Sequence, residues 1–155
     1  MFWGKTIMVS GNININQRLD EHGTSQRTRD QYLSEGIVYY QAKKFQLALT
    51  SCQKAIQLDS NYARAFHGKG LALTELKRYQ EAIVALQQSI FIHPQNARVD
   101  ADLGKVYYEQ RQFKEAGEAY RQAIHFDSHI TQAYHDLTKT LVDKADSLYE
   151  RVKFD

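Results

Sequence analysis

The chain has 155 residues, of which 43% are apolar and 25% are charged, and its formal charge at pH 7 is +2. This length favours a single domain with enough apolar side chains to form a core. Lys and Arg are interleaved with Asp and Glu, which argues against a nucleic-acid-binding surface. No apolar run approaches the roughly 18 residues of a membrane span, so we expect no membrane insertion.

Residue usage predicts an all-α fold and a reducing compartment. The chain has one proline and eight glycines among many strong helix formers, which suits long helices better than a sheet with many tight turns. Its one cysteine, Cys52, cannot form an internal disulfide. We therefore expect a soluble, cytoplasmic, helical protein.

Residues 1–28 stand apart from the rest of the chain. They contain two short apolar stretches, Met1–Trp3 and Ile7–Val9, followed by a mostly polar segment. Two interpretations are open: a flexible N-terminal arm, or an arm that docks on the remainder of the chain through Trp3 or its isoleucines.

The segment from residue 29 to residue 130 is organised by a period of 34 residues. Gly36, Gly70 and Gly104 follow one another at this spacing. Twelve residues after each glycine stands an alanine, and the apolar residues between them have helical spacing. Small side chains let two helices approach closely, so each unit is predicted to be a pair of helices that cross at the glycine and the alanine.

This pattern resembles the tetratricopeptide repeat (TPR), a 34-residue motif with an aromatic, a Leu-Gly pair, a Tyr, an Ala and a Pro at set positions. The resemblance divides the chain into repeats at 29–62, 63–96 and 97–130. It implies an α-solenoid of antiparallel helix pairs, about seven helices in a right-handed superhelix. Some places depart from the motif. Asp100 replaces the first aromatic of the third repeat, Gly117 lies inside a predicted helix, and Ser60 and Ser128 stand where the motif has proline. We expect Ser60 and Ser128 to act as N-caps, and Gly117 to loosen the third repeat.

Residues 131–155 are predicted to form a closing helix. Its apolar residues recur every three or four positions and its other faces are charged, as expected of the terminal element of a repeat stack. The apolar stripe is longer than one repeat helix, so Leu148 and Val152 form a possible surface for oligomerisation.

The chain carries no pattern that indicates catalysis or a cofactor. His125, His129 and His135 lack the spacing of a metal motif, and Cys52 falls at a packing position with no histidine placed to activate it. We expect no enzyme activity, no cofactor and no metal.

The resemblance implies that the first helices of the repeats line a concave groove for a peptide or helix of another protein. The residues transferred to this groove are Leu33, Ile37, Tyr40, Arg64, His67, Leu71, Arg98, Lys105, Tyr108 and Lys139. They predict an apolar floor at the first end, lysines at the other, and a basic rim that includes Arg64 and Arg98.

One branch of the family binds chaperone C-termini through a carboxylate clamp, but the clamp positions here hold Leu33, Ile37, Gly68, Arg98 and Asp102. Four of these five differ from the clamp, so a chaperone C-terminus is not the expected ligand.

The sequence therefore predicts a protein–protein interaction adaptor, without naming the partner. Two alternatives remain open: a homo-oligomeric scaffold assembled through the closing helix, and a regulatory subunit of a separately encoded enzyme.

Overall fold

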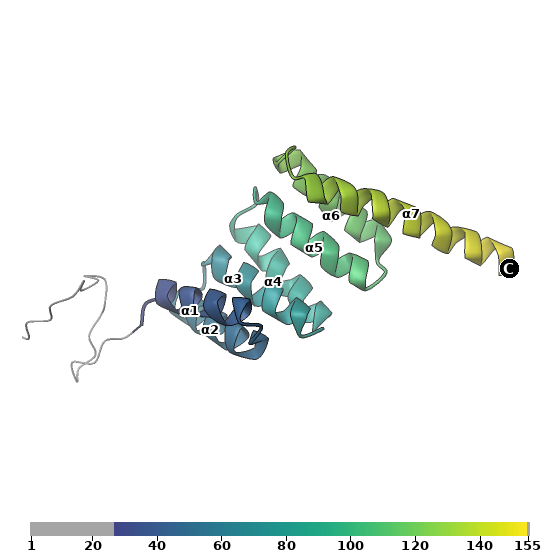
Figure 1. Ribbon diagram of the computed structural model, residues 1–155. Coiled ribbons are helices and arrows are strands. Elements are labelled where there is room, and N and C mark those ends of the chain that lie inside the picture. The colour runs from purple at the N-terminus through teal and green to yellow at the C-terminus, as the bar shows by residue number, and fades with distance from the viewer. Residues whose placement is uncertain (1–26, 155) are drawn as a thin grey trace, which may run out of the picture.

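The computed structural model describes residues 27–154, all of whose regular structure is helical. It contains seven helices packed in sequential antiparallel pairs, which confirms the predicted fold class (Figure 1). Their bounds are α1 Arg29–Gln41, α2 Phe45–Leu58, α3 Ala63–Glu75, α4 Tyr79–Ile92, α5 Ala97–Glu109, α6 Phe113–Phe126 and α7 Thr131–Phe154. The possible docking of the N-terminal arm concerns residues 1–26, which lie outside the described range.

The turn inside each pair is the same in all three repeats. Lys43, Lys77 and Arg111 adopt positive φ values of 58°, 61° and 58°. In the first turn, Lys44 N–H donates to the Tyr39 carbonyl at 2.8 Å and Lys43 N–H to the Tyr40 carbonyl at 2.9 Å. This is a Schellman ending, in which a left-handed residue satisfies the last helical carbonyls. A basic side chain there also suits the negative end of the helix dipole.

The turns after α2 and after α6 are stabilised by aspartate rather than by the predicted serines, Ser60 and Ser128. Helix α3 begins after Tyr62, and no side chain caps its first turn. Instead the Asp59 carboxylate accepts a hydrogen bond from the Asn61 N–H at 2.9 Å. Asp127 makes the same bond to the N–H two residues further on. The N-cap prediction for Ser60 was wrong because an Asx turn already satisfies this backbone.

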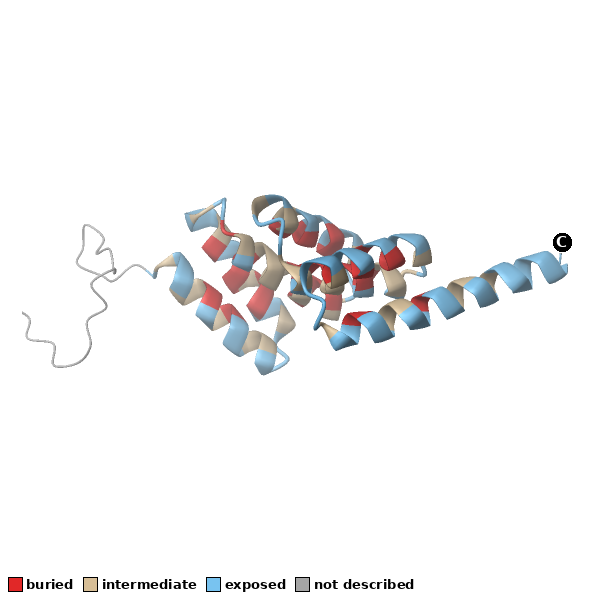
Figure 2. Ribbon diagram, turned by 90° about the horizontal axis from the view of Figure 1, so that it is seen from above, coloured by how far each residue is buried: buried red, intermediate tan, exposed pale blue. Residues whose placement is uncertain are grey.

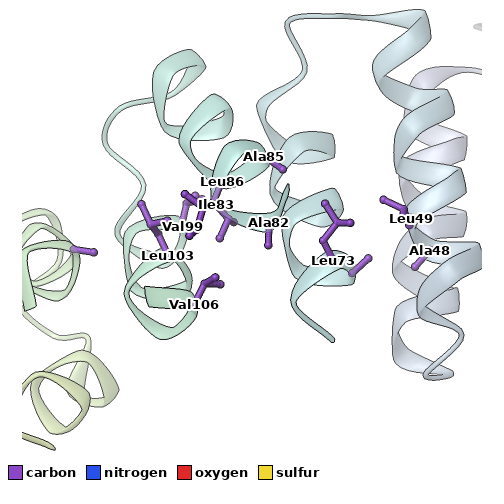
Figure 3. Close-up of a cluster of buried hydrophobic side chains, with 12 residues drawn as sticks. Ala48, Leu49, Leu73, Ala82, Ile83, Ala85, Leu86, Val99, Leu103 and Val106 are labelled. Carbon is purple, nitrogen blue, oxygen red and sulfur yellow. The ribbon is translucent and has the colours of Figure 1, made fainter. Parts of the chain in front are cut away.

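The core lies where the paired helices cross, as the small residues predicted. Figure 3 shows its largest cluster, in which Ala82 and Leu86 of α4 face residues of α3 and α5. At Gly70 an added Cβ would lie 2.6 Å from Leu86 Cγ and 3.5 Å from the Ala82 carbonyl oxygen. Any side chain at Gly70 would therefore push α3 and α4 apart.

The seven helices form two layers. Backbone contacts join α1 to α3, α3 to α5 and α5 to α7, whereas α2, α4 and α6 make none with one another among the described residues. The first helices are therefore closer together than the second helices, and the stack curves toward the α1, α3, α5 and α7 layer. This layer forms the concave face.

Two departures from the repeat motif have measurable consequences in the third repeat. Asp100 is only 5% exposed, its Oδ2 atom has no hydrogen-bond partner among residues 27–154, and burial raises its pKa to about 6. Gly117 leaves room instead, since an added Cβ would come no closer than 3.7 Å to Leu137.

Candidate functional site

The concave face contains an apolar pocket between α1 and α3, which we call the anchor pocket. It has a volume of about 300 Å³ and is lined by Leu33, Gly36, Ile37, Tyr40, Gln41, Cys52, Gly68 and Leu71. Leu33 is 4% exposed and forms part of its floor, whereas Ile37 is 43% exposed. A side chain at Gly68 would collide with Cys52, because an added Cβ would lie 2.8 Å from the sulfur.

The second-helix residue that lines the anchor pocket is Cys52. Cys52, Leu86 and Tyr120 occupy the same register position in the three second helices, sixteen residues after the repeat glycine. Each lies against its own glycine: an added Cβ would be 3.1 Å from the Cys52 sulfur at Gly36 and 2.8 Å from the Tyr120 ring at Gly104. Burial raises the pKa of the Cys52 thiol to about 11, so at neutral pH it is an uncharged packing group.

The other end of the concave face has a polar pocket between α5 and α7. It has a volume of about 440 Å³, and the residues that line it are Ala101, Asp102, Lys105, Tyr108, Glu109, Tyr120, Ile130, Gln132, Ala133, Asp136 and Lys139. Two lysines and three carboxylates face this space, so its charges are mixed rather than purely basic.

Hydrogen bonds between successive first helices connect the two pockets. Tyr40 donates to the Glu75 carboxylate at 3.3 Å, and Tyr108 donates to Asp143. Burial and the Glu75 charge raise the pKa of Tyr40 to about 12, so this phenol keeps its proton at neutral pH. Between them, His67 Nε2 lies 2.6 Å from Asp102 Oδ2. Each bond joins residues 35 apart and fixes one repeat against the next.

Two of the three carboxylates of the polar pocket are already hydrogen-bonded, whereas Glu109 is exposed, as is Lys105. Asp102 is bonded to His67, and Asp136 accepts a hydrogen bond from Gln132 at 2.8 Å. Lys105 is exposed and forms no ion pair within residues 27–154, not even with Glu109 one turn away.

Lys139 lies over the aromatic ring of Tyr108, with its Nζ 4.9 Å from the ring centroid. Hydrogen bonding to this phenol raises the pKa of Lys139. Lys139 therefore remains cationic at neutral pH.

The predicted groove residues lie in three places: the anchor pocket, the polar pocket and the region between them. The anchor pocket contains Leu33, Ile37, Tyr40 and Leu71, the polar pocket contains Lys105, Tyr108 and Lys139, and His67 lies between them. Arg64 and Arg98 are exposed at the starts of α3 and α5 and line neither pocket.

Sequence reasoning missed the second-helix residues that reach the concave face, above all Tyr120. The available signal was their register: they lie sixteen residues after a glycine that has no side chain to block them.

These features define a helical repeat protein whose concave face contains an apolar and a polar pocket. Tetratricopeptide repeat family models match residues 33–97 and 73–141. The chain belongs to the tetratricopeptide repeat family.

Solved structures share this fold. The TPR domain of Arabidopsis OM64 is 19% identical, with a TM-score of 0.73 over 75% of this chain and 96% of that one. MamA is 27% identical, with a TM-score of 0.73 over 76% of this chain and 68% of that one. The first TPR domain of Spaghetti (RPAP3), bound to the HSP90 peptide SRMEEVD, is 15% identical, with a TM-score of 0.74 over 82% and 97%. A comparison with curated protein sequences found no match.

No helix within residues 27–154 is both long enough and apolar enough to cross a membrane.

Proposed function

We propose that the concave face binds a segment of another protein, either an extended peptide or a helix. An apolar side chain of the ligand occupies the anchor pocket, and an acidic group lies near Lys105 and Lys139 of the polar pocket. The observation that carries this proposal is the anchor pocket itself, an open apolar cavity of about 300 Å³ between α1 and α3. Binding sites are typically concave and apolar, with a few placed polar groups.

Peptide binding by similar folds supports the class of ligand but not its sequence. The RPAP3 domain is bound to a chaperone peptide, whereas this chain has apolar Leu33 and Ile37 at two positions of the carboxylate clamp. Asp102, at a third, is negative and already bonded to His67. A terminal carboxylate would meet too few hydrogen-bond donors at these clamp positions. The proposed ligand therefore differs from a chaperone C-terminus.

The energetics assign different roles to the two pockets. Burying a Leu-sized or Met-sized side chain contributes about 1.5–3 kcal/mol. Partly exposed ion pairs contribute about 0–1 kcal/mol each, so the charges set orientation and association rate more than affinity. The apolar anchor is therefore expected to dominate binding.

The proposal is tested with peptides selected from a random library on the full-length protein. Affinity is then measured for two variants, Cys52→Leu and Leu71→Asp. Cys52→Leu introduces into the anchor pocket the larger side chain that the second repeat has at the same position, Leu86. Each should weaken binding at least tenfold, corresponding to about 1.4 kcal/mol. Arg98→Glu should weaken it less, because Arg98 lines neither pocket.

Circular dichroism melts of the variants serve as the folding control. Selected peptides whose affinities are unchanged in folded Cys52→Leu and Leu71→Asp would place binding elsewhere on the molecule, and the proposal would fail.

A further inference from the structure

Helix α7 exposes a face that the other first helices use for packing. In α1, α3 and α5 the eighth residue is the repeat glycine, which contacts the second helix of its own pair. The eighth residue of α7 is Thr138, which is exposed. By the same register Leu141 corresponds to Leu73, yet Leu73 is 1% exposed and Leu141 is 44% exposed. Within the described residues, this side of α7 lacks the antiparallel helix that covers its counterparts.

The chain does not turn where the earlier repeats supply that helix. Lys43, Lys77 and Arg111 adopt positive φ in the turns, whereas Ala145, at the same register position, lies inside α7. Helix α7 instead runs straight for 24 residues. Its second half projects beyond the stack and is almost entirely exposed (Figures 1 and 2).

A stripe that is apolar except for Thr138 follows the open face of α7. Its members are separated alternately by four and three residues, the spacing of a coiled-coil seam. They are Tyr134, Thr138, Leu141, Ala145, Leu148 and Val152. Leu148 is 49% exposed and Val152 is 79% exposed. Large residues (Tyr134, Leu141, Leu148) alternate with smaller ones along the stripe.

We propose that α7 pairs antiparallel with α7 of a second copy of this chain. When Leu141 faces Ala145 of the second copy, Thr138 faces Leu148 and Tyr134 faces Val152. Each large side chain then meets a smaller one, and the two-fold axis makes the interface the same patch on both chains. The projecting half of each α7 covers the open face of the other, in the direction that α2, α4 and α6 take on their own partners.

The charges of α7 permit this pairing. Residues 131–142 contain Asp136 and Lys139, and residues 143–154 contain three acidic and three basic side chains. Each half is therefore neutral, so the antiparallel arrangement brings no net repulsion. On the side of the seam away from α6, Val142, which is 53% exposed, faces Val142 of the second copy at the two-fold axis. The one like-charged contact, between the two Lys144 side chains, lies on the side of α6 and carries a small penalty because it is solvated.

This interface is separate from the concave face. The α7 residues that line the polar pocket are Gln132, Ala133, Asp136 and Lys139, none of which belongs to the stripe. Dimerisation through α7 and ligand binding on the concave face can therefore be tested independently.

Sedimentation equilibrium of the full-length protein is the first test. The wild type should show a concentration-dependent dimer, Leu148→Glu should remain monomeric, and the matched control Glu150→Gln, on the opposite side of α7, should behave as wild type. Leu148 lies beyond the packed part of α7, so Leu148→Glu should keep its helical circular dichroism. A wild type that is monomeric up to its solubility limit would overturn the proposal.

Symmetric cross-linking tests the direction of the pairing. Under oxidation Val142→Cys should form a disulfide-linked dimer, because Val142 faces its own copy at the axis, while native Cys52 is buried and remains in place. Tyr149→Cys should not, because an antiparallel pair places Tyr149 opposite His135. A parallel pair would place the two copies of each of these residues on opposite sides of the seam and would cross-link neither variant. A Val142→Cys protein that dimerises without cross-linking would therefore also overturn the proposal.

Discussion

The unpartnered Asp100 carboxyl is expected to make the protein less stable at neutral pH than at mildly acidic pH. The residue is 95% buried, and its Oδ2 atom has no hydrogen-bond partner in the part of the chain that the structure describes. Burial raises its pKa from 3.8 to about 6, because ionisation in an apolar environment lacks the solvation that water provides. Asp100→Asn removes the charge and nearly preserves the shape.

The direction of the change in stability with pH follows from the number of protons bound in the folded and unfolded states. Between pH 3.8 and about 6 the folded state holds the Asp100 proton and the unfolded state releases it, so the free energy of unfolding falls as the pH rises. Below this window Asp100 adds no penalty, and above it the penalty is complete. A difference of about two pKa units corresponds to about 3 kcal/mol, at 1.36 kcal/mol per unit.

Urea denaturation of the wild type and of Asp100→Asn from pH 4 to pH 8 measures this penalty. The variant's stability relative to the wild type should rise by up to about 3 kcal/mol across the window. Asp146→Asn changes an exposed carboxylate of α7 and should follow the wild type throughout. Parallel profiles for the wild type and Asp100→Asn would show that Asp100 is solvated, and the reasoning would be refuted.

Two further predictions concern small residues in the helix crossings. Gly117→Ala should raise the free energy of unfolding by up to about 1 kcal/mol, since the site has room for a methyl group; Gly70→Ala should lower it, because the new Cβ meets Leu86. A thermal melt in which Gly70→Ala gains as much stability as Gly117→Ala would contradict the difference in space. Ala82→Trp should cost several kcal/mol at a residue that is fully buried, and an unchanged melting temperature would contradict the close crossing of α3 and α4.

The arrangement of helices could be predicted from the sequence because it depends on a few repeated residues. The 34-residue spacing of Gly36, Gly70 and Gly104 fixed where the helices cross, and the helices recur with that same spacing. The loss of the aromatic at Asp100 and the glycine at Gly117 marked the third repeat as atypical. The structure adds that Asp100 introduces a buried charge whereas Gly117 leaves space.

The details of the concave face were less predictable because they depend on contacts between repeats. The bond between His67 and Asp102 joins residues on different helices, and no periodicity within one helix reveals it. The anchor pocket combines first-helix residues of two repeats with Cys52 of a second helix, where the other second helices have Leu86 and Tyr120. Asp59 and Ser60 are adjacent, and the side chain of either residue can hydrogen-bond the backbone of this turn. The sequence alone did not show that Asp59 makes the bond.

The central claim is that the anchor pocket receives an apolar side chain of a protein ligand, and photo-cross-linking tests it most directly. A selected peptide carries a photoreactive group in place of its apolar anchor, and mass spectrometry locates the residue it labels on the full-length protein. The account predicts labelling at the rim of the anchor pocket, at Ile37 of α1 or Leu71 of α3. Labelling confined to α2, α4 and α6, or to the exposed stripe of α7, would contradict it.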